Sequence, residues 1–263
     1  GRRRGDGADD LFASYGHIRL ESAIAALNRA TLEGRKPGSL EFGFFDGRRK
    51  FVSDMAGLDP WVRRLAYAAF MEDEKKELLS SKGKMYLNGA DTTVFLRDIY
   101  QRSPEGTGVV NKMLYLDIST LLPNEILFFN DMLSMAHSVE VRTPFLDYRM
   151  VELACTISDT LKIRDGMLKY TLRKVAARYL PKEILERPKE GFVLPENQWM
   201  RGEMLPMIRE TLTEERLAAH GLFDGAYVNG LLNRFVDGDE TLTFKLWTLV
   251  MFQIWYEDHK ITI

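Results

Sequence analysis

The sequence predicts a mainly α-helical protein, because apolar residues recur at helical spacing in several long stretches and strand patterns are scarce. DPWVRRLAYAAFM opens with an Asp-Pro step and NEILFFNDMLSMAH follows Pro123, so each has a helix-starting signal ahead of its apolar face. The C-terminal stretch TLTFKLWTLVMFQIWY is apolar nearly all round, which favours a helix of the core. The expectation is a helical, bundle-like body.

Three predicted helices have recognisable faces or ends. In the first, Trp61, Leu65 and Ala68 share one face. The second covers 124–137 and is apolar along one side. KYTLRKVAARYL forms a third, which stops at Pro181 because proline cannot continue a helix.

One stretch resembles a β-hairpin. FGFFDGRRKFV, over 42–52, carries Asp46-Gly47, a dipeptide suited to a tight turn between two strands. Loops are expected over 33–60, 102–109 and around 186–197.

Composition indicates a globular, cytoplasmic protein. The chain has 263 residues, with 36 Lys and Arg against 38 Asp and Glu, so its net charge of −2 favours neither nucleic acid nor an anionic membrane. The one cysteine, Cys155, excludes an internal disulfide and any cysteine-rich metal site. The longest apolar stretch, 246–256, falls short of the roughly 20 residues that cross a bilayer.

The stretch HSVEVRTPFLDYRMVELA, over 137–154, carries two charges in an extended segment. Glu140 and Arg142 alternate with valines, so both charged side chains point to the same side. A Thr-Pro step follows, and Asp147 then sits where the next helix needs an N-cap. The two charges are suited to orienting an anionic substrate, and equally to forming a structural ion pair that closes a loop.

The stretch ERPKEGFVLPENQWM, over 186–200, places Lys189 between Pro188 and Gly191. Glycine gives such a loop the freedom to fold over a site, and a lysine ammonium neutralises charge that develops on phosphate. An ordinary solvated lysine in a turn is the alternative.

The opening stretch GRRRGDGADDLFASY has glycines on both sides of an acid. Gly5 and Gly7 leave backbone N–H groups open to phosphate oxygens, and Asp9 is a hard oxygen ligand suited to Mg²⁺. The sequence has neither a P-loop nor the spacing of an EF-hand. Taken alone, such a turn is more often a feature of the surface.

Together and in this order, the three stretches resemble the C-terminal part of the synthetase domain of glutamine-dependent asparagine synthetases. The resemblance runs from Gly5 to about Asp258 and is weakest between 20 and 110. It implies the helical C-terminal portion of an adenine-nucleotide α-hydrolase-like (PP-loop) α/β synthetase domain, with most of the parallel sheet absent. Residues 1–263 would form one partial domain that begins just past a strand.

The family's reaction gives the implied substrates and partners. ATP adenylates the side-chain carboxylate of aspartate, and ammonia derived from glutamine then forms asparagine, AMP and pyrophosphate. ATP and Mg²⁺ are the implied cofactors. The glutaminase domain and the Ser-Gly-Gly-x-Asp-Ser ATP loop are not in this sequence, so we expect them in cis or as a separate subunit, and we expect the chain alone to be inactive. Apolar surface left without its sheet would favour a homo-oligomer.

The resemblance also implies roles for single residues. The implied catalytic residues are Lys189, Glu140 and Asp6; the implied ATP and pyrophosphate contacts are Gly5, Gly7, Arg142 and Lys189; and the implied metal ligand is Asp9.

The sequence departs from the family at three of its positions. Asp6 stands where most members have glutamate, and Phe129 and Met132 stand where many have lysine and arginine. Asp6 argues against β-lactam-forming relatives, which carry a tyrosine near this position. Peptide-cyclising and sugar-amidating ligases remain alternatives, as does a non-catalytic helical subunit or scaffold.

Overall fold

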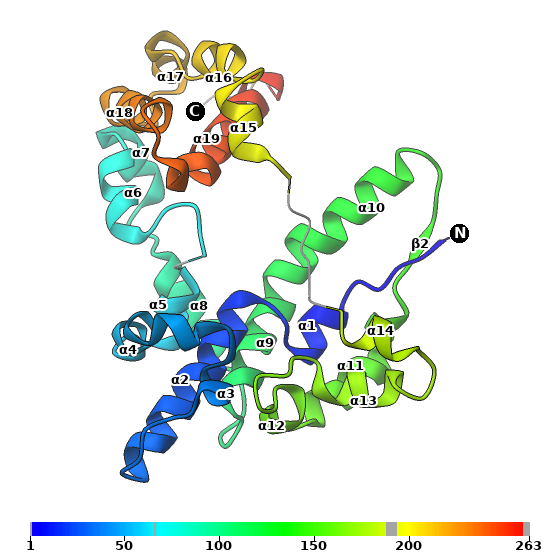
Figure 1. Cartoon of the computed structure of the whole chain (residues 1–263). Helices are drawn as coiled ribbons and strands as arrows, with labels where there is room; N and C mark the ends of the chain where they lie inside the picture. The colour runs from blue at the N-terminus through cyan, green and yellow to red at the C-terminus, as the bar shows by residue number, and fades with distance from the viewer. Residues whose placement is uncertain (1, 66, 188–193, 260–263) are drawn as a thin grey trace. The chain divides into compact units, whose positions relative to one another are not determined.

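The computed structural model describes residues 2–65, 67–187 and 194–259, and these residues are mainly helical (Figure 1). They divide into two compact units. The first takes Gly1–Arg64 and Thr93–Pro188, and the second takes Leu65–Thr92 and Lys189–Ile263. The mainly helical character predicted from the sequence is confirmed.

The elements of the first unit, in chain order, are β1 (Arg2–Arg3), α1 (Ala8–Phe12), α2 (Gly16–Leu32), α3 (Ser39–Phe42), the 3₁₀ helix η1 (Gly43–Arg48), α4 (Arg49–Ala56), α5 (Pro60–Leu65), α8 (Thr92–Tyr100), α9 (Val109–Ser119), the π-helical η2 (Leu122–Leu127), α10 (Phe128–Met135), β2 (Val141–Arg142), η3 (Pro144–Leu146), α11 (Tyr148–Thr156), α12 (Asp159–Lys162), α13 (Tyr170–Ala176) and α14 (Lys182–Leu185). The end residues of α5 and α8 fall at the border with the second unit.

Those of the second unit are α6 (Glu72–Leu78), α7 (Ser81–Leu87), α15 (Glu196–Arg201), α16 (Leu205–Thr211), α17 (Glu214–His220), α18 (Gly225–Val236), η4 (Glu240–Leu242) and α19 (Thr243–Asp258). Its core gathers around Phe235, Ile208 and Leu246, all fully buried. His220 and Gln253, joined by a 2.9 Å hydrogen bond, tie α17 to α19 inside the same unit.

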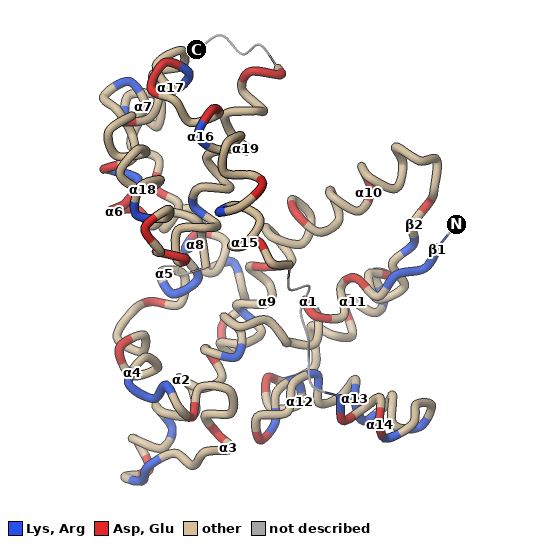
Figure 2. The backbone as a smooth tube through the Cα atoms, turned by 45° about the horizontal axis from the view of Figure 1, so that its top comes forward, with Lys and Arg blue, Asp and Glu red and all other residues tan. Residues whose placement is uncertain are grey.

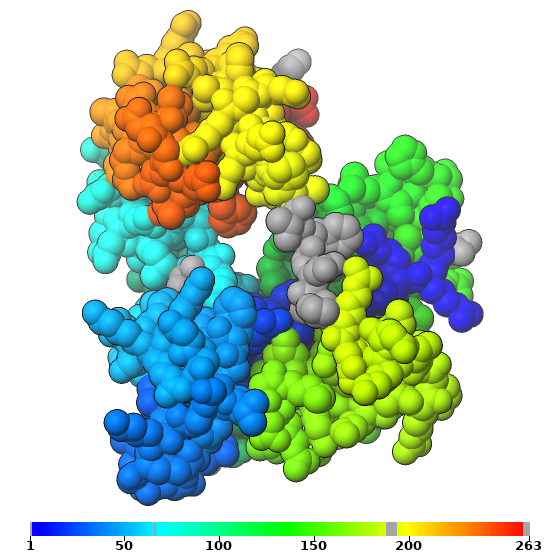
Figure 3. Space-filling model, in the orientation of Figure 1, coloured from blue at the N-terminus to red at the C-terminus, as the bar shows by residue number. Residues whose placement is uncertain are grey.

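The described residues contain one small sheet, in which β1 and β2 run parallel. Arg2 lies opposite Val141 and Arg3 opposite Arg142. Figure 2 shows the two strands side by side, and in Figure 3 the blue N-terminal residues lie on the green surface of the segment that carries β2. The expectation that the chain begins just past a strand is therefore wrong, because Arg2–Arg3 form a strand ahead of the Gly5–Gly7 turn.

The predicted hairpin over 42–52 is also wrong. The segment folds as η1 and α4, because Phe42, Phe45 and Val52 recur at helical spacing and pack on the buried side of α2. Asp46 accepts a 3.0 Å hydrogen bond from Nε of Arg49 and does not turn a hairpin. The predicted loop over 33–60 accordingly contains three helical segments, whereas the loop over 102–109 is confirmed up to Gly108, since α9 begins at Val109.

The predicted helices exist with different bounds. α5 ends at Leu65, before Ala68, and α13 ends at Ala176, ahead of Pro181. The helix predicted over 124–137 is present as η2 followed by α10. Asp147 caps α11 as predicted, by accepting from the backbone N–H of Arg149.

The C-terminal helix α19 is a core helix on one face only. Leu246, Leu249 and Val250 are buried, whereas Phe244 and Trp255 are 56% and 46% exposed. Within the described part of the chain, no helix combines the length and the apolar character that crossing a membrane requires.

Candidate functional site

The candidate site begins at the carboxyl ends of the two strands. The backbone N–H of Arg2 donates to the carbonyl of Glu140 at 2.8 Å, and that of Arg4 donates to the carbonyl of Arg142 at 3.0 Å. Because the strands are parallel, the two segments leave the sheet at the same edge. β1 leads into the Gly5–Gly7 turn and β2 leads into Thr143. Ligands of open α/β sheets bind outside this edge.

Gly7 is required by the turn itself. Its φ is +90°, in the left-handed region that favours glycine, and a Cβ there would overlap the side chain of Leu146. Leu146 belongs to η3, which directly follows the β2 segment. The carbonyl of Gly7 also accepts from the N–H of Leu11 at 2.9 Å, at the start of α1. The turn is therefore packed against the segment that carries the other half of the site.

Gly5 differs from Gly7, because its surroundings are open. A Cβ at this position would meet no atom within 4 Å, and its φ lies outside the left-handed region. Packing among the described residues does not require glycine here. A glycine in open space beside a strand end leaves the backbone accessible to a bound phosphate.

Asp6 is held by two residues that the sequence analysis did not single out. Nδ2 of Asn130, on α10, donates to Oδ2 of Asp6 at 3.0 Å, and Nε of Arg4 lies 3.5 Å from the same oxygen. Arg4 also donates to the amide oxygen of Asn130. Asn130 is almost fully buried, so α10 fixes the Asp6 carboxylate through one neutral amide.

Glu140 and Arg142 form an ion pair, with Nε of Arg142 donating to Oε1 of Glu140 at 2.8 Å. Both side chains are largely exposed. The hydrogen bond from Arg142 lowers the pKa of Glu140 and raises that of the guanidinium. An exposed pair is compatible with a structural role and also with orienting a substrate. The guanidinium donors of Arg142 that do not contact Glu140 face solvent and can bind a ligand.

Asp9 points to α13. Nζ of Lys169 lies 2.9 Å from Oδ1 of Asp9, and the hydroxyl of Ser14 donates to the same oxygen. Lys169 has a left-handed backbone, φ 52°, at the residue before α13. An ammonium thus occupies the position next to the carboxylate that the sequence analysis assigned to a metal.

Asp10, the neighbour of Asp9, is buried and its carboxyl group has few hydrogen-bond partners. It is 1% exposed, its Oδ1 has no hydrogen-bond partner among the described residues, and the hydroxyl of Tyr15 reaches Oδ2 at 3.5 Å. Burial, with the charges of Asp117 and Asp9 as smaller causes, raises the pKa of Asp10 to about 6. The pKa of Tyr15 is raised as well, first by burial and then by Asp10.

A buried network fixes α2 beside α9. Asp117, fully buried on α9, contacts Nε2 of His17 through one oxygen and accepts from Nε of Arg64 at 2.9 Å through the other. The imidazole of His17 stacks on the ring of Tyr15 at a centroid distance of 5.8 Å. These contacts hold the end of the segment that starts with the Gly-Asp-Gly turn.

Lys189 lies outside the described residues, so the structure leaves its predicted role untested. The described residues also contain no group of three or more His, Cys, Asp or Glu side chains that could hold a metal ion. A magnesium ion bound with ATP needs only one or two protein carboxylates, because phosphate oxygens supply further ligands. Asp9 meets that smaller requirement through its partly exposed carboxylate, although a metal ion there would have to displace or share the ammonium of Lys169.

Sequence reasoning missed Asn130, Arg4 and Lys169. An asparagine inside the apolar run FFNDMLSM was a usable signal, because buried amides need partners. Nothing local marked Arg4 and Lys169, which are ordinary basic residues until the fold brings Asp6 and Asp9 to them.

Comparison with known proteins identifies a family. The asparagine synthase family model matches residues 4–257. Asparagine synthetase [glutamine-hydrolyzing] 1 of Bacillus subtilis is 32% identical over 259 residues, which cover 96% of this chain and 39% of the relative. Asparagine synthetase [glutamine-hydrolyzing] 3 of the same organism is 28% identical over 69% of this chain and 29% of its own length.

A more distant relative is amidase chry2 of Gibberella zeae, which is 28% identical over 44% of this chain and 18% of its own length. No solved structure matches the chain. The chain spans about two fifths of the length of the first Bacillus relative. The extent of the family match, together with the 32% identity over nearly all of its residues, shows that this chain belongs to the asparagine synthase family.

Proposed function

We propose that the chain is one part of an ATP-dependent amide ligase that makes asparagine from aspartate. In the first step an oxygen of the aspartate side-chain carboxylate attacks the α-phosphorus of ATP, and pyrophosphate leaves. In the second step the nitrogen of ammonia attacks the activated acyl carbon, loses a proton, and AMP leaves. ATP is consumed in this reaction and Mg²⁺, bound to Asp9 and phosphate oxygens, would supply charge neutralisation.

The residues of this chain would act mainly by position and charge. Arg142 supplies guanidinium donors to phosphate or to the acceptor carboxylate, since a planar fork suits both groups. Glu140 is an exposed carboxylate suited to accepting the proton of the attacking amine. Lys189 would neutralise the leaving pyrophosphate. Asp6, held by Asn130, would orient the amide-forming step.

One observation carries the proposal. The parallel pairing of β1 with β2 brings the Gly5–Gly7 turn to the same sheet edge as Arg142, the last residue of β2 and the ion-pair partner of Glu140, although more than 130 residues separate the turn from Arg142 in the chain. The reaction class in this proposal comes from membership of the family. The acceptor, aspartate, comes from the names of the relatives, which are asparagine synthetases.

Asparagine formation is the direct test. The chain is assayed with Mg-ATP, aspartate and ammonia, first alone and then with a separately produced protein half that carries the Ser-Gly-Gly-x-Asp-Ser loop. We expect no asparagine from the chain alone and formation in the mixture. Turnover by the chain alone would contradict the need for a second half, and ATP cleavage without amide would contradict the acceptor.

Arg142 has a matched control in the same unit. Arg149 is equally exposed and pairs with Asp147, also two residues away, at 2.8 Å. Arg142→Gln and Lys189→Ala should each lower the rate of the active mixture by at least about 100-fold, as losing a transition-state donor does, whereas Arg149→Gln should leave it unchanged. Equal losses in the two arginine variants would remove Arg142 from the site.

A non-catalytic helical subunit is the second candidate. Phe128, Phe129, Met132 and Leu133 of α10 are all more than half exposed, which is typical of a surface that binds another protein. If the chain is a scaffold, the mixture above forms a stable complex and makes no amide with any acceptor carboxylate.

A further inference from the structure

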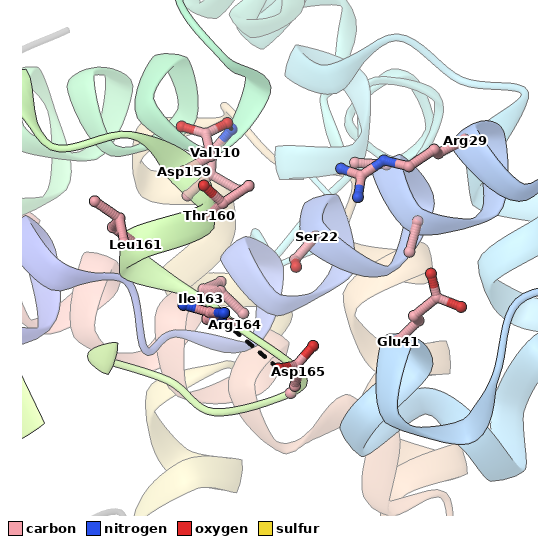
Figure 4. Close-up of a pocket in the computed structure, with 13 residues that line it drawn as sticks. Ser22, Arg29, Glu41, Val110, Asp159, Thr160, Leu161, Ile163, Arg164 and Asp165 are labelled. Atoms are coloured by element: carbon pink, nitrogen blue, oxygen red, sulfur yellow. Dashed lines mark hydrogen bonds and ion pairs between the residues drawn. The ribbon is translucent and has the colours of Figure 1, made fainter. Parts of the chain in front are cut away.

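The first unit contains a hollow that the proposed reaction does not use. It measures about 460 Å³ and lies between α2 and the segment 159–166, with Glu41 of α3 at its rim (Figure 4). A smaller recess of about 100 Å³ shares Ser22, Ile163 and Gly166 with it, so the two form one continuous groove along α2. The larger hollow alone falls in the size range of small-molecule sites, roughly 300–1,000 Å³.

The floor of the groove is one face of α2. Arg19, Ser22, Ala26 and Arg29 lie at spacings of three or four residues, so they share that face. At about 1.5 Å per residue, the two arginines stand roughly 15 Å apart along the helix. The small residues between them leave the space that a ligand would fill.

The opposite wall is held by two glycines that touch. A Cβ at Gly166 would lie 3.0 Å from the carbonyl oxygen of Leu40 and 3.5 Å from Cα of Gly43, and φ at Gly166 is +75°. Neither the close contact at Gly166 nor its positive φ suits a residue with a side chain. This contact joins the 159–166 segment to the α3–η1 turn, which makes the groove a built feature of the unit and not a gap between mobile loops.

The carboxylates that line the hollow are already saturated. Both oxygens of Glu41 accept from Arg35, each at 2.8 Å, and one also accepts from the N–H of Gly38. The hydrogen bonds from Arg35 lower the pKa of Glu41 to about 2.

Asp159 is committed in a similar way, because its two oxygens accept from the backbone N–H groups of Val110 and Asn111 at 3.0 Å each. Asp165 is mostly exposed to solvent. The acids of the hollow therefore have little capacity left for a cationic ligand.

The guanidinium groups are in the opposite condition. Arg29 has no ion pair or hydrogen bond with any described side chain. Nε of Arg19 is buried without a hydrogen-bond partner in the described chain, and the group lies 5.4 Å from the centre of the Phe44 ring. Arg164 has a 3.3 Å hydrogen bond to the hydroxyl of Tyr170 and only a loose, 3.8 Å ion pair with Asp165. Three arginines from two sides of the groove thus retain unused donors.

We propose that this groove binds an anionic small molecule, whose phosphate or carboxylate groups are held by Arg29, Arg19 and Arg164 and whose body lies over Ser22 and Ala26. Guanidinium forks bind both kinds of anion with two parallel hydrogen bonds. The site goes beyond the proposed function, because none of its residues belongs to the Gly5–Gly7 turn or to β2, and Lys189 is not among them. Its ligand would be an effector or a second substrate of the parent protein.

Calorimetric titration of the full chain with inorganic phosphate and, separately, with succinate tests the site and distinguishes the two anion types. The titrations use an Arg142→Gln, Lys189→Ala background, which removes the two side-chain contacts to phosphate proposed at the other site. We expect at least one probe to bind. Arg29→Gln should weaken it about tenfold, as loss of one charge-assisted contact does. Binding of phosphate alone identifies a phosphorylated ligand, and binding of succinate alone identifies a carboxylate.

Two further variants separate the site from general charge effects. Arg97→Gln removes another exposed arginine of the same unit, one that pairs with Asp98, and should change nothing. Ala26→Phe fills the floor and keeps every charge, and should abolish binding. No binding of either probe, equal losses in Arg29→Gln and Arg97→Gln, or unchanged binding in Ala26→Phe would each overturn the proposal. Circular dichroism confirms that the variants are folded.

Discussion

The ammonium of Lys169 lies 2.9 Å from Oδ1 of Asp9, and this ion pair joins α1 to the start of α13. The two side chains are 24% and 33% exposed, so the contact is neither a loose surface pair nor a deeply buried one. It neutralises the carboxylate to which the sequence assigned a magnesium ion. A metal at Asp9 would have to displace or share this lysine.

Replacing Lys169 therefore predicts a gain in cation binding. In Lys169→Met the Asp9 carboxylate loses its resident charge, and we expect Mg²⁺ or Mn²⁺ to bind severalfold more tightly in the absence of nucleotide. Titration with Mn²⁺, followed by electron paramagnetic resonance, measures this affinity. Lys174→Met, on the same helix, is the control and should leave it unchanged. Weaker cation binding in Lys169→Met would show that the lysine supports the metal site.

The two glycines of the opening turn should respond differently to alanine. Gly7→Ala introduces both a left-handed alanine and an overlap with Leu146, and should lower the free energy of unfolding by about 2–4 kcal/mol. Gly5→Ala meets open space and should lower it by less than about 1 kcal/mol. Urea unfolding of both variants provides the comparison. A large loss in Gly5→Ala would mean that this glycine serves folding and is not kept open for a ligand.

The raised pKa of Asp10 predicts that the stability of the protein depends on pH. Because burial raises its pKa to about 6, the folded protein prefers the neutral acid. The resulting stabilisation is complete below about pH 4 and is lost as the pH rises through 6, since the ordinary pKa is 3.8. At pH 8 the buried carboxylate thus costs on the order of 3 kcal/mol relative to its state in acid.

Asp10→Asn removes that dependence and keeps the shape of the side chain. We expect the variant to match the wild-type melting temperature near pH 4 and to exceed it at pH 8. Thermal unfolding at pH values from 4 to 8 gives both curves, and their difference isolates Asp10 from the other titrating groups. If the melting temperatures of the two proteins changed in parallel from pH 4 to pH 8, Asp10 would be ionised in the folded protein and its charge stabilised by its surroundings.

The buried pair of Arg63 and Glu21 predicts a non-additive effect. Two hydrogen bonds of 2.6 Å join the side chains, which are 5% and 1% exposed. Arg63→Met leaves an uncompensated buried carboxylate and should cost about 3–5 kcal/mol, whereas adding Glu21→Leu should recover most of that loss. Urea unfolding of the single and double variants measures the coupling. Additive losses would contradict it, and Arg97→Met provides the exposed control, with an effect within about 0.5 kcal/mol.

The exposed apolar face of α10 predicts self-association of the chain. Phe129 and Met132 are 59% and 55% exposed. The double variant Phe129→Lys, Met132→Arg should remain folded and shift the sedimentation of the chain toward the monomer. Val94→Lys, on α8, adds charge at another exposed apolar residue and should have no such effect. Unchanged association in the double variant would place the contact elsewhere.

The main parts of the candidate site could be found from the sequence because they are local. Gly5, Gly7 and Asp9 fall within five residues, and Glu140 and Arg142 lie two apart, so spacing alone restricts their geometry. The error over 42–52 has the same origin, since Asp46-Gly47 is a good turn signal locally. Packing of Phe42, Phe45 and Val52 on α2 outweighed it, because burying three apolar side chains is worth more than a preferred turn.

The sequence by itself determined the helical class, the family and the motifs at the sheet edge, because each depends on residues close together in the chain. Only the tertiary structure decided which distant side chains complete them: Asn130 beside Asp6, Lys169 beside Asp9, and the arginines that face one groove along α2. Those pairings depend on how helices pack after folding. Packing is decided by the sum of many buried contacts across the chain, and a local pattern carries no record of that sum.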